Sequence, residues 1–317
     1  MNMQQYNGSV ALTGGTGFIG HHLVSALVRE GWRVKALTRQ PGALPENTNL
    51  QPITGALEDQ SALHHLVAGV DAVIHVGGLI AARNLREFES ANVFGTENLI
   101  RAAAGQPQPP KVIYMSTMAA REPHLSAYAA TKREGENRLC DLGQGLHWQI
   151  IRPPVVYGPG DKQTFKLFRQ FKNGFALELG SGGRFSMIYV DDLISAILYL
   201  LQDFARDSTI FELDDGHDNG YSWSDVVDEA SRKLNRGVRN ILVPTAVQHL
   251  IAMSGSAVSA VTKCPPILSR GKINEFAHSD WIAKNNLLSD AGDWKPNINL
   301  RDGISRTIDW YVWHGWL

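Results

Sequence analysis

A glycine-rich turn near the N-terminus, in the segment VALTGGTGFIGHH (10–22), is the feature that most constrains the fold. Gly14, Gly17 and Gly20 are spaced three residues apart, and a second register through Gly15 fits G-x-G-x-x-G. The turn follows an apolar β-branched run and directly precedes a helical pattern. Glycine lets the backbone approach a pyrophosphate closely, and the N–H groups at the start of a helix attract the phosphate charge. The segment therefore predicts a strand–turn–helix unit that binds a dinucleotide.

The first two thirds of the chain alternate short β-branched runs with longer helical patterns. The runs predicted as strands are 9–14, 33–39, 50–55, 72–77, 111–117 and 148–153. The stretches predicted as helices between them are 20–31, 60–69, 92–105 and 128–142. Nearly continuous apolar strands that alternate with helices indicate a parallel sheet covered on both faces. Right-handed crossovers then make it a doubly wound α/β sheet, the Rossmann arrangement.

The pattern changes after about residue 160, where short helices and scattered strands replace the regular alternation. We therefore predict a Rossmann dinucleotide-binding core over 1–160 and a smaller, mainly substrate-binding lobe over 161–317, with some segments returning to the core. Five of the eight tryptophans follow residue 280, and we expect them to form a satellite core that seals the C-terminus. One of these tryptophans lining a substrate pocket is the alternative interpretation.

Composition and charge argue against several classes of function. Of 317 residues, 44% are hydrophobic and 19% are charged, and the formal net charge of -1 predicts no nucleic-acid footprint. Two cysteines, without C-x-x-C or H-E-x-x-H, favour a reduced, cytoplasmic protein with no metal site. No signal peptide and no transmembrane segment are expected. The most apolar stretch, 243–264, is interrupted by Gln248 and His249, and it predicts one or two amphipathic helices that cover the substrate or touch a membrane surface.

The end of the second predicted strand bears on the choice of cofactor. An acidic residue there would bind the 2′-hydroxyl of NAD, but this chain has Thr38 followed by Arg39. A guanidinium group pairs with a phosphate through two parallel hydrogen bonds, so Arg39 suits the 2′-phosphate of NADP. The sequence favours NADP(H) over NAD(H). The plain alternative is an exposed arginine at the end of a strand.

The pentapeptide YAATK (128–132) places Tyr128 and Lys132 four residues apart, on one face of a helix. By itself such a pair most often lies on a solvated surface. The alternative is a phenol that transfers protons, because a nearby ammonium group favours the ionised form of a tyrosine, whose ordinary pKa is about 10. The pair alone does not decide between these interpretations.

Six motifs that occur in one order favour the second interpretation. They are the glycine turn, DAVIHVGG (71–78), NVFGTENL (92–99), YMST (114–117), YAATK and RPPVVYGPGD (152–161). Together they resemble the extended short-chain dehydrogenase/reductase family, which includes nucleotide-sugar epimerases and dehydratases, dihydroflavonol-type reductases and 3β-hydroxysteroid dehydrogenases. The resemblance covers nearly the whole chain, because FSMIYVDDLISAI (185–197) and residues 265–311 are similar to later elements of the reductase branch.

The resemblance implies a catalytic group of Thr117, Tyr128 and Lys132. In this family the tyrosine donates or accepts a proton at the substrate carbonyl or hydroxyl, and the lysine lowers its pKa while reaching the nicotinamide ribose. A serine or threonine after the fifth strand hydrogen-bonds the substrate oxygen. Thr117 matches that position best, and Ser116, which points to the other face of an extended strand, is the second choice.

The resemblance also implies which residues contact the cofactor. Val76, Gly77 and Gly78 would pass under it, and Pro153 and Val155 would border the nicotinamide. The predicted cofactor-binding residues are Gly14, Gly17, Phe18, Ile19, Gly20, Arg39, Leu57, Val76, Gly77, Gly78, Lys132, Pro153 and Val155. Leu57 is included because Ala56 replaces the acid with which the family usually contacts the adenine.

Three further positions match the family pattern. Asn92 corresponds to an asparagine in the helix after the fourth strand, where its plain role is a buried hydrogen bond at the helix start. Asp191 and Asp192 are expected to cap the helix that follows them. Homodimerisation through the helices of 92–105 and 128–142 is common in the family and is expected here.

Two departures from the family bear on the substrate. Only ten residues (118–127) separate Thr117 from Tyr128, and Pro154, Val155 and Val156 occupy a segment where nucleotide-sugar enzymes place an asparagine. Apolar side chains would leave the oxygens of a buried sugar diphosphate unpaired, which is costly. The sequence therefore favours an NADP(H)-dependent oxidoreductase of a small, relatively apolar substrate. The alternatives are an NAD-dependent nucleotide-sugar epimerase or dehydratase, and a non-catalytic dinucleotide-binding sensor or assembly subunit.

Overall fold

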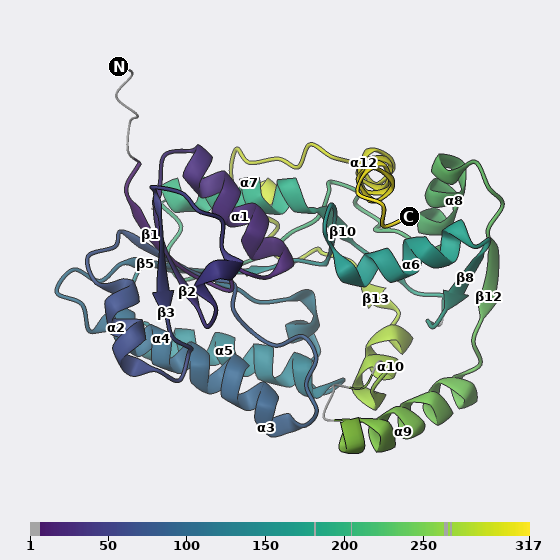
Figure 1. Cartoon of the computed structure of the whole chain (residues 1–317), viewed down its shortest axis with the longest axis horizontal. Coiled ribbons are helices and arrows are strands. Elements are labelled where there is room, and N and C mark those ends of the chain that lie inside the picture. Colours follow the sequence, from purple (N-terminus) through teal and green to yellow (C-terminus); the bar gives the residue numbers. More distant parts are fainter. Residues whose placement is uncertain (1–6, 181, 204, 263–265, 267) are drawn as a thin grey trace.

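A parallel sheet of seven strands forms the centre of the molecule (Figure 1). The computed structural model describes residues 7–180, 182–203, 205–262, 266 and 268–317, with the backbone alone at 254–262. In chain order the strands are β1 (Ser9–Thr13), β2 (Arg33–Thr38), β3 (Leu50–Thr54), β4 (Ala72–His75), β5 (Lys111–Met115), β6 (Trp148–Arg152) and β11 (Thr209–Glu212). Their order across the sheet is β11-β6-β5-β4-β1-β2-β3. Because the order runs outward in both directions from β1 and β4, the predicted doubly wound Rossmann fold is confirmed.

The strands are buried on both faces, as their continuous apolar sequences require. Successive side chains of a strand point to opposite faces of the sheet. Val10 and Leu12 of β1 therefore join one hydrophobic cluster with Leu23, whereas Ala11 joins a second cluster with Leu63. These two clusters form the core on the two sides of the sheet.

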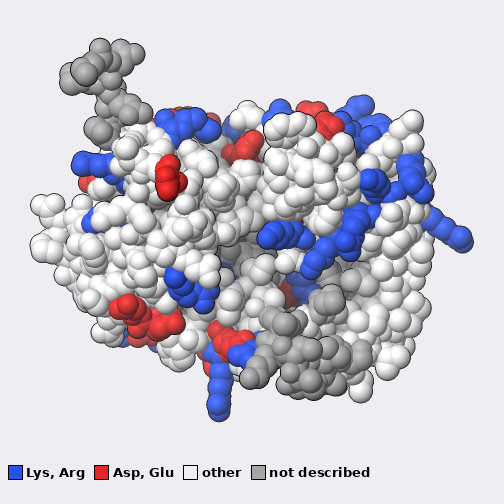
Figure 2. Space-filling model, viewed as in Figure 1, with Lys and Arg blue, Asp and Glu red and all other residues white. Residues whose placement is uncertain are grey.

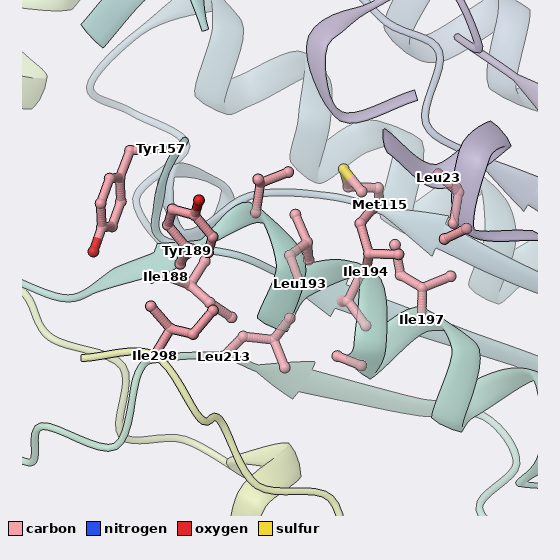
Figure 3. Close-up of a cluster of buried hydrophobic side chains, with 14 of the residues drawn as sticks. Leu23, Met115, Tyr157, Ile188, Tyr189, Leu193, Ile194, Ile197, Leu213 and Ile298 are labelled. Carbon is pink, nitrogen blue, oxygen red and sulfur yellow. The ribbon is translucent and has the colours of Figure 1, made fainter. Parts of the chain in front are cut away.

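Helices cover each face of the sheet (Figure 1). One side carries α1 (Phe18–Arg29) and α7 (Val190–Gln202), and the other carries α2 (Gln60–Val67), α4 (Gly95–Ala104) and α5 (Ala127–Leu142). Figure 3 shows the cluster on the first side, where Leu193, Ile194 and Ile197 of α7 lie near Leu23 and Met115. Since α7 and β11 both follow residue 160, part of the second half of the chain belongs to the central sheet and its core.

The remaining elements form a smaller lobe at one end of the sheet (Figure 1). Its helices are α6 (Lys162–Lys172), α8 (Trp223–Leu234), α9 (Thr245–Thr262), α10 (Arg270–Ala277), α11 (Leu288–Ala291) and α12 (Leu300–Trp313). Its strands form three parallel pairs, β7 (Val155–Tyr157) with β10 (Met187–Tyr189), β8 (Phe175–Glu178) with β12 (Arg239–Leu242), and β9 (Arg184–Phe185) with β13 (Asp280–Trp281). Within the described ranges, no helix combines the length and the hydropathy that crossing a bilayer requires.

The C-terminal tryptophans do not form the predicted satellite core. Trp294 is buried in the main cluster on the α7 side of the sheet, and Trp310 and Trp316 pack against that cluster. The rings of Trp316 and Tyr311 stack with centroids 5.5 Å apart, whereas Trp313 is 83% exposed. The prediction was wrong because α12 packs directly on α8 and β10, so that its aromatic side chains extend the main core.

The acidic pair at the start of α7 has a different role from the predicted cap. Tyr189 occupies the N-cap position of α7, and no side chain caps this helix. Asp192 is buried and accepts hydrogen bonds from the backbone N–H groups of Asn297 and Ile298, at 3.1 and 2.8 Å. Asp192 thus ties the segment before α12 to the core.

Candidate active site at the carboxyl edge of the sheet

The glycine turn between β1 and α1 is packed too closely against neighbouring backbone to admit side chains at Gly14 and Gly20. Gly14 has φ +78°, and a Cβ on it would lie 2.7 Å from the backbone nitrogen of Gly77. A Cβ on Gly20 would overlap the carbonyl oxygen of Gly14. Helix α1 begins at Phe18 with Gly17 as N-cap, without a capping side chain and without an acid in its first turn. Its first N–H groups are therefore available to a phosphate, and the turn fits the pyrophosphate of a dinucleotide.

The strip that follows β4, residues 76–78, lies between the glycine turn and the predicted catalytic residues. Gly77 packs against the Gly14 turn, and a Cβ on Gly77 would lie 2.8 Å from Thr13 Oγ1. A Cβ on Gly78 would lie 2.9 Å from Asn92 Oδ1 and 3.9 Å from Lys132 Nζ. The two glycines are therefore required by close packing on both sides of the strip.

Asn92 holds the end of this strip by both atoms of its side-chain amide. It lies in a π-helical segment, Glu89–Phe94, between α3 (Leu85–Phe88) and α4. Its Oδ1 accepts from the backbone N–H of Leu79 at 2.8 Å, and its Nδ2 donates to the Leu79 carbonyl at 3.0 Å and to Thr131 Oγ1 at 3.2 Å. Asn92 thus joins the loop after β4 to α5, which goes beyond the helix-start hydrogen bond expected from the sequence.

A buried chain of hydrogen bonds also supports the strip of residues 76–78. The hydroxyl of Thr96 donates to the carbonyl of Asn92 at 2.8 Å, so it accepts from Nε2–H of His75 at 2.9 Å. Nδ1 of His75 is then an acceptor, and the Thr13 hydroxyl donates to it at 2.6 Å while accepting from Gly77 N–H at 3.0 Å. Burial lowers the pKa of His75 to about 3, so the imidazole stays neutral and keeps this arrangement.

Helix α5 carries the predicted tyrosine and lysine. Its N-cap is Ser126, whose hydroxyl accepts from the backbone N–H of Ala129 at 2.9 Å. Lys132 is buried, and its Nζ donates to the Met115 carbonyl at the end of β5, at 2.7 Å, and lies 4.3 Å from the centre of the Tyr114 ring. Burial lowers the pKa of Lys132 to about 7, against the opposing effect of Glu136.

Tyr128 is half-buried at the first turn of α5, with its ring 6.3 Å from that of Phe88. Burial raises its pKa to about 12, a hydrogen bond with Thr117 acts to lower it, and the charge of Glu275 acts to raise it. In the protein without cofactor the pKa of Tyr128 is therefore raised, not lowered as predicted from the presence of Lys132, because burial is the largest effect.

Thr117 and Ser116, the two candidates after β5, have different surroundings. Thr117 is the N-cap of a short 3₁₀ helix, Met118–Arg121, where its Oγ1 accepts from Ala119 N–H at 3.2 Å, and its side chain is near enough to Tyr128 to lower the pKa of the phenol. Ser116 is buried and donates to Glu136, which is bound by Arg152 through two hydrogen bonds of 2.8 and 2.6 Å. The structure thus brings Thr117 to Tyr128 and commits Ser116 to a buried polar cluster.

The predicted residues for the adenosine side lie at the carboxyl ends of β2 and β3. Thr38 is buried and its hydroxyl bonds the backbone of Gln40, donating to its carbonyl and accepting from its N–H, both at 3.0 Å. Arg39 is exposed, and in the part of the chain that the structure describes it makes no ion pair. Leu57 packs against Gly95, where a Cβ would lie 2.9 Å from the leucine Cβ.

The predicted residues on the nicotinamide side follow β6. Pro153 is buried and its carbonyl accepts from Met118 N–H at 3.1 Å, which ties the segment after β6 to the one after β5. Val155 opens β7 and is 44% exposed. No three His, Cys, Asp or Glu side chains in the described ranges are grouped as metal ligands would be.

The smaller lobe contacts α5, the helix of Tyr128 and Lys132, through α10, a contact that local sequence signals did not reveal. Glu275 accepts a hydrogen bond from Ser126 Oγ and Asn274 Nδ2 donates to the Leu125 carbonyl at 3.1 Å. Farther along, Arg121 donates to the carbonyls of Asp280 and Ile282 at 2.6 and 2.8 Å. The short segment 118–127 is therefore fastened to the lobe on one side of Tyr128.

Comparison with known proteins is consistent with this geometry. Residues 10–213 match the family model described as NAD dependent epimerase/dehydratase family. The chain is 35% identical to the ceramide reductase of Caulobacter vibrioides over 315 residues, which cover 98% of this chain and 96% of the relative. It is 30% identical to the 2-alkyl-3-oxoalkanoate reductase of Stenotrophomonas maltophilia over 58% of this chain and 62% of that protein. Among solved structures, MoeE5 in complex with UDP-glucuronic acid and NAD has a TM-score of 0.75 at 22% identity, covering 97% of this chain and all of the other.

Proposed function

The chain belongs to the NAD dependent epimerase/dehydratase family and is an NAD(P)-dependent enzyme of the extended short-chain dehydrogenase/reductase type, and from this premise we propose that it is a ketone reductase of lipid-like substrates. The observation that carries the proposal is full-length identity of 35% to a reductase named for ceramide, together with Thr117, Tyr128 and Lys132 at one edge of the sheet. The 2-alkyl-3-oxoalkanoate reductase, which is similar over part of the chain, is named for a 3-oxo acid that carries an alkyl group.

In this reaction the residues of the chain would have the following roles. The glycine turn and the start of α1 bind the pyrophosphate, and the strip of 76–78 supports the nicotinamide, which when bound supplies or accepts the hydride. Thr117 orients the substrate oxygen through its hydroxyl. Tyr128 donates the proton to that oxygen in reduction and accepts it in oxidation. Lys132, which needs little energy to lose or gain its proton near neutral pH, supports the change of charge at Tyr128.

Apolar side chains at the mouth of the site support a lipid-like substrate. Val155 is half-exposed beside the predicted nicotinamide position, and Leu79 and Ile80 are exposed directly after the 76–78 strip. Exposed aliphatic groups next to a polar reacting centre suit a ketone on a hydrocarbon chain. They offer no hydrogen-bond donors to the phosphates of a sugar nucleotide.

We also propose that the enzyme prefers NADP(H). The support is Arg39, exposed and without an ion pair among the described residues, beside a Thr38 whose hydroxyl is already used by the Gln40 backbone. A free guanidinium group at the end of β2 suits a 2′-phosphate. The 2′-hydroxyl of NAD(H) would have no acidic partner there and would therefore gain less binding energy.

Two other functions remain as alternatives. A sugar-nucleotide epimerase or dehydratase with tightly held NAD is favoured by the UDP-glucuronic acid and NAD in the structurally similar MoeE5. A non-catalytic dinucleotide-binding subunit would keep the fold without turnover. Homodimerisation through α4 and α5 stays a prediction; the outward ion pairs Arg101–Glu97 and Arg138–Glu134 mark the faces that sedimentation velocity would test.

The test is NADPH oxidation by the purified protein with long-chain ketones, including 2-alkyl-3-oxoalkanoates, and with short-chain ketones of the same head group. We expect turnover that increases with chain length and that falls by roughly 10²–10⁴ in Tyr128→Phe. The protein would first be denatured and its supernatant assayed for bound dinucleotide. Co-purifying NAD with saturable stabilisation by UDP-sugars would overturn the proposal in favour of the epimerase. Dinucleotide binding without turnover of any ketone or sugar nucleotide would favour the non-catalytic subunit.

A further inference from the structure

In the part of α9 whose side chains the structure describes (245–253), the large apolar side chains are exposed and the polar Gln248 is buried. Gln248 and Ala252, four residues apart, are buried; Gln248 donates to the Val243 carbonyl at 2.8 Å, and Ala252 packs with Leu268 and Ile273. Leu250 is 67% exposed, although a leucine on a surface helix normally faces the core. The helix therefore presents apolar side chains to its surroundings.

This apolar face continues onto the neighbouring strand pair. Ile241 of β12 pairs in register with Leu177 of β8, and both are exposed, as is Leu242 at 64%. Within the described residues, the apolar patch is formed by Leu177, Ile241, Leu242, Val247, Leu250 and Met253. Contiguous exposed apolar groups of this kind mark a binding surface rather than ordinary surface scatter.

Basic side chains lie next to the apolar patch, in two segments of the chain that contain no acidic residue. Residues 162–177 contain four Lys or Arg and no Asp or Glu, and residues 230–262 contain another four and again no acid. They are Lys162, Lys166, Arg169, Lys172, Arg232, Lys233, Arg236 and Arg239. Figure 2 shows blue side chains gathered over the region of α6, α8 and β12 at the right of the molecule. Arg236 lies against Gly174 in the turn before β8, so basic and apolar side chains meet on the same strand pair.

We propose that the patch of β8, β12 and α9 docks on the surface of an anionic lipid bilayer. A helix that is free of charged residues, exposes apolar side chains and is flanked by basic ones lies in a membrane interface, with its apolar side chains in the acyl region and the cations at the headgroups. A net charge of -1 for the whole chain does not oppose this, because charge is unevenly distributed along it. Arg232 and Lys233 are paired with Glu229 and Asp309, and Glu178 at the end of β8 accepts from Asn240, so the cations that can face headgroups are the other six. Binding of the patch to a bilayer does not require a helix that crosses the bilayer.

Docking at this patch places the lipid surface one helix away from the site. The buried face of α9 packs on α10, and Glu275 and Asn274 of α10 hydrogen-bond Ser126 and Leu125 at the start of α5, two residues before Tyr128. A lipid substrate, which rests on the function proposed above, could then pass from the bilayer to the site without crossing water. The binding to a bilayer itself does not require that function.

Co-sedimentation with vesicles tests the proposal. The protein is mixed with vesicles of phosphatidylcholine alone or of phosphatidylcholine with phosphatidylglycerol, at low and at high salt. We expect binding to the phosphatidylglycerol vesicles that weakens with salt. The double variant Leu242→Glu/Leu250→Glu and the double variant Arg236→Glu/Arg239→Glu should each lower the partition coefficient by roughly tenfold or more. Val312→Glu, at an exposed apolar position of α12, is the matched control and should bind as the wild type does.

Folding and function are monitored separately. Because Leu242 and Leu250 are exposed, their variants should melt like the wild type and should reduce a water-soluble short-chain ketone at the same rate. Absence of binding to either vesicle, or equal binding by all variants, would overturn the proposal. The proposal would also be overturned if the wild type were a dimer that does not bind vesicles and that Leu242→Glu/Leu250→Glu dissociates. The patch would then join two copies of the chain. Vesicle binding by a protein that reduces no ketone would leave this inference standing while the proposed function failed.

Discussion

Thr13 at the end of β1 donates a hydrogen bond of 2.6 Å to Nδ1 of His75 at the end of β4, and this contact joins the two strands between which the dinucleotide is expected. The same threonine hydroxyl accepts from Gly77 N–H, so one side chain connects the strand under the glycine turn with the strip that faces the site. The neutral state of His75, whose pKa burial lowers to about 3, makes the contact insensitive to pH in the physiological range.

Thr13→Val should therefore weaken both the fold and the binding of dinucleotide. Valine has a similar volume but leaves Nδ1 of His75 and the Gly77 N–H without their partner, at a cost of roughly 1–3 kcal/mol in the free energy of unfolding. Urea unfolding and calorimetric titration with dinucleotide would measure the two effects. Thr54→Val, at the exposed carboxyl end of β3, is the control, and an equal loss in both variants would show that the hydrogen bond has no special role.

Thr117→Val and Ser116→Ala should separate the two candidates after β5. Removing the hydroxyl that lies against Tyr128 should lower kcat by roughly 10²-fold with little change in stability. Removing the Ser116 hydroxyl should instead lower stability, because Glu136 loses a buried donor, and should leave kcat within a fewfold of wild type. Steady-state kinetics and thermal melting of both variants give the answer, and the opposite pattern would exchange the roles of the two residues.

Arg39→Ala should lower the affinity for NADPH by about 10–100-fold, since a bond between a guanidinium group and a phosphate is charge-assisted. Affinity for NADH should change little. Arg29→Ala, an exposed arginine near the end of α1, is the matched control. Titration of both proteins with both dinucleotides is the measurement. Tighter binding of NADH than NADPH by the wild type would contradict the preference itself.

Lys132 should make the stability of the protein rise with pH over a defined window. Burial lowers its pKa to about 7, whereas an unfolded lysine has the ordinary value of 10.5. Between these values the unfolded chain binds more protons, so the free energy of unfolding increases with pH by up to ~1.4 kcal/mol per pH unit. In Lys132→Met this contribution disappears. Subtracting the variant's unfolding curve from the wild type's isolates it, with Lys166→Met as an exposed control, and a flat difference between pH 7 and 10 would contradict the buried state of Lys132.

The fold and the main parts of the site could be predicted because their signals are local. The glycine turn, the six apolar strands and the spacing of Tyr128 and Lys132 each occupy a short stretch of sequence, and the parallel topology follows from their alternation. The structure places Thr117 against Tyr128 in agreement with the preferred interpretation, although their catalytic roles stay predictions.

Contacts over long sequence separations could not be predicted. Thr13 and His75 are 62 residues apart, and Ser126 and Glu275 are 149 apart, so no pattern in one element reveals its partner in the other. The raised pKa of Tyr128 depends on burial in the folded protein and, to a smaller degree, on the charge of Glu275, which lies far away in the sequence. Periodicity could not predict the orientation of α9 either, because its large apolar side chains within 245–253 are exposed. Residues 263–264 of the predicted 243–264 stretch lie outside the described residues.

The return of α7 and β11 to the central sheet limits how this enzyme can be recombined with its relatives. A chimera that exchanged everything after residue 160 would replace an edge strand of the sheet and the helix packed over β5, in addition to the substrate lobe. Substrate preference should therefore be transferable only when residues 187–213 stay with the recipient and the donor supplies the segments on either side. The two ends of this internal block, rather than the boundary between the halves of the chain, are the natural crossover points for such exchanges.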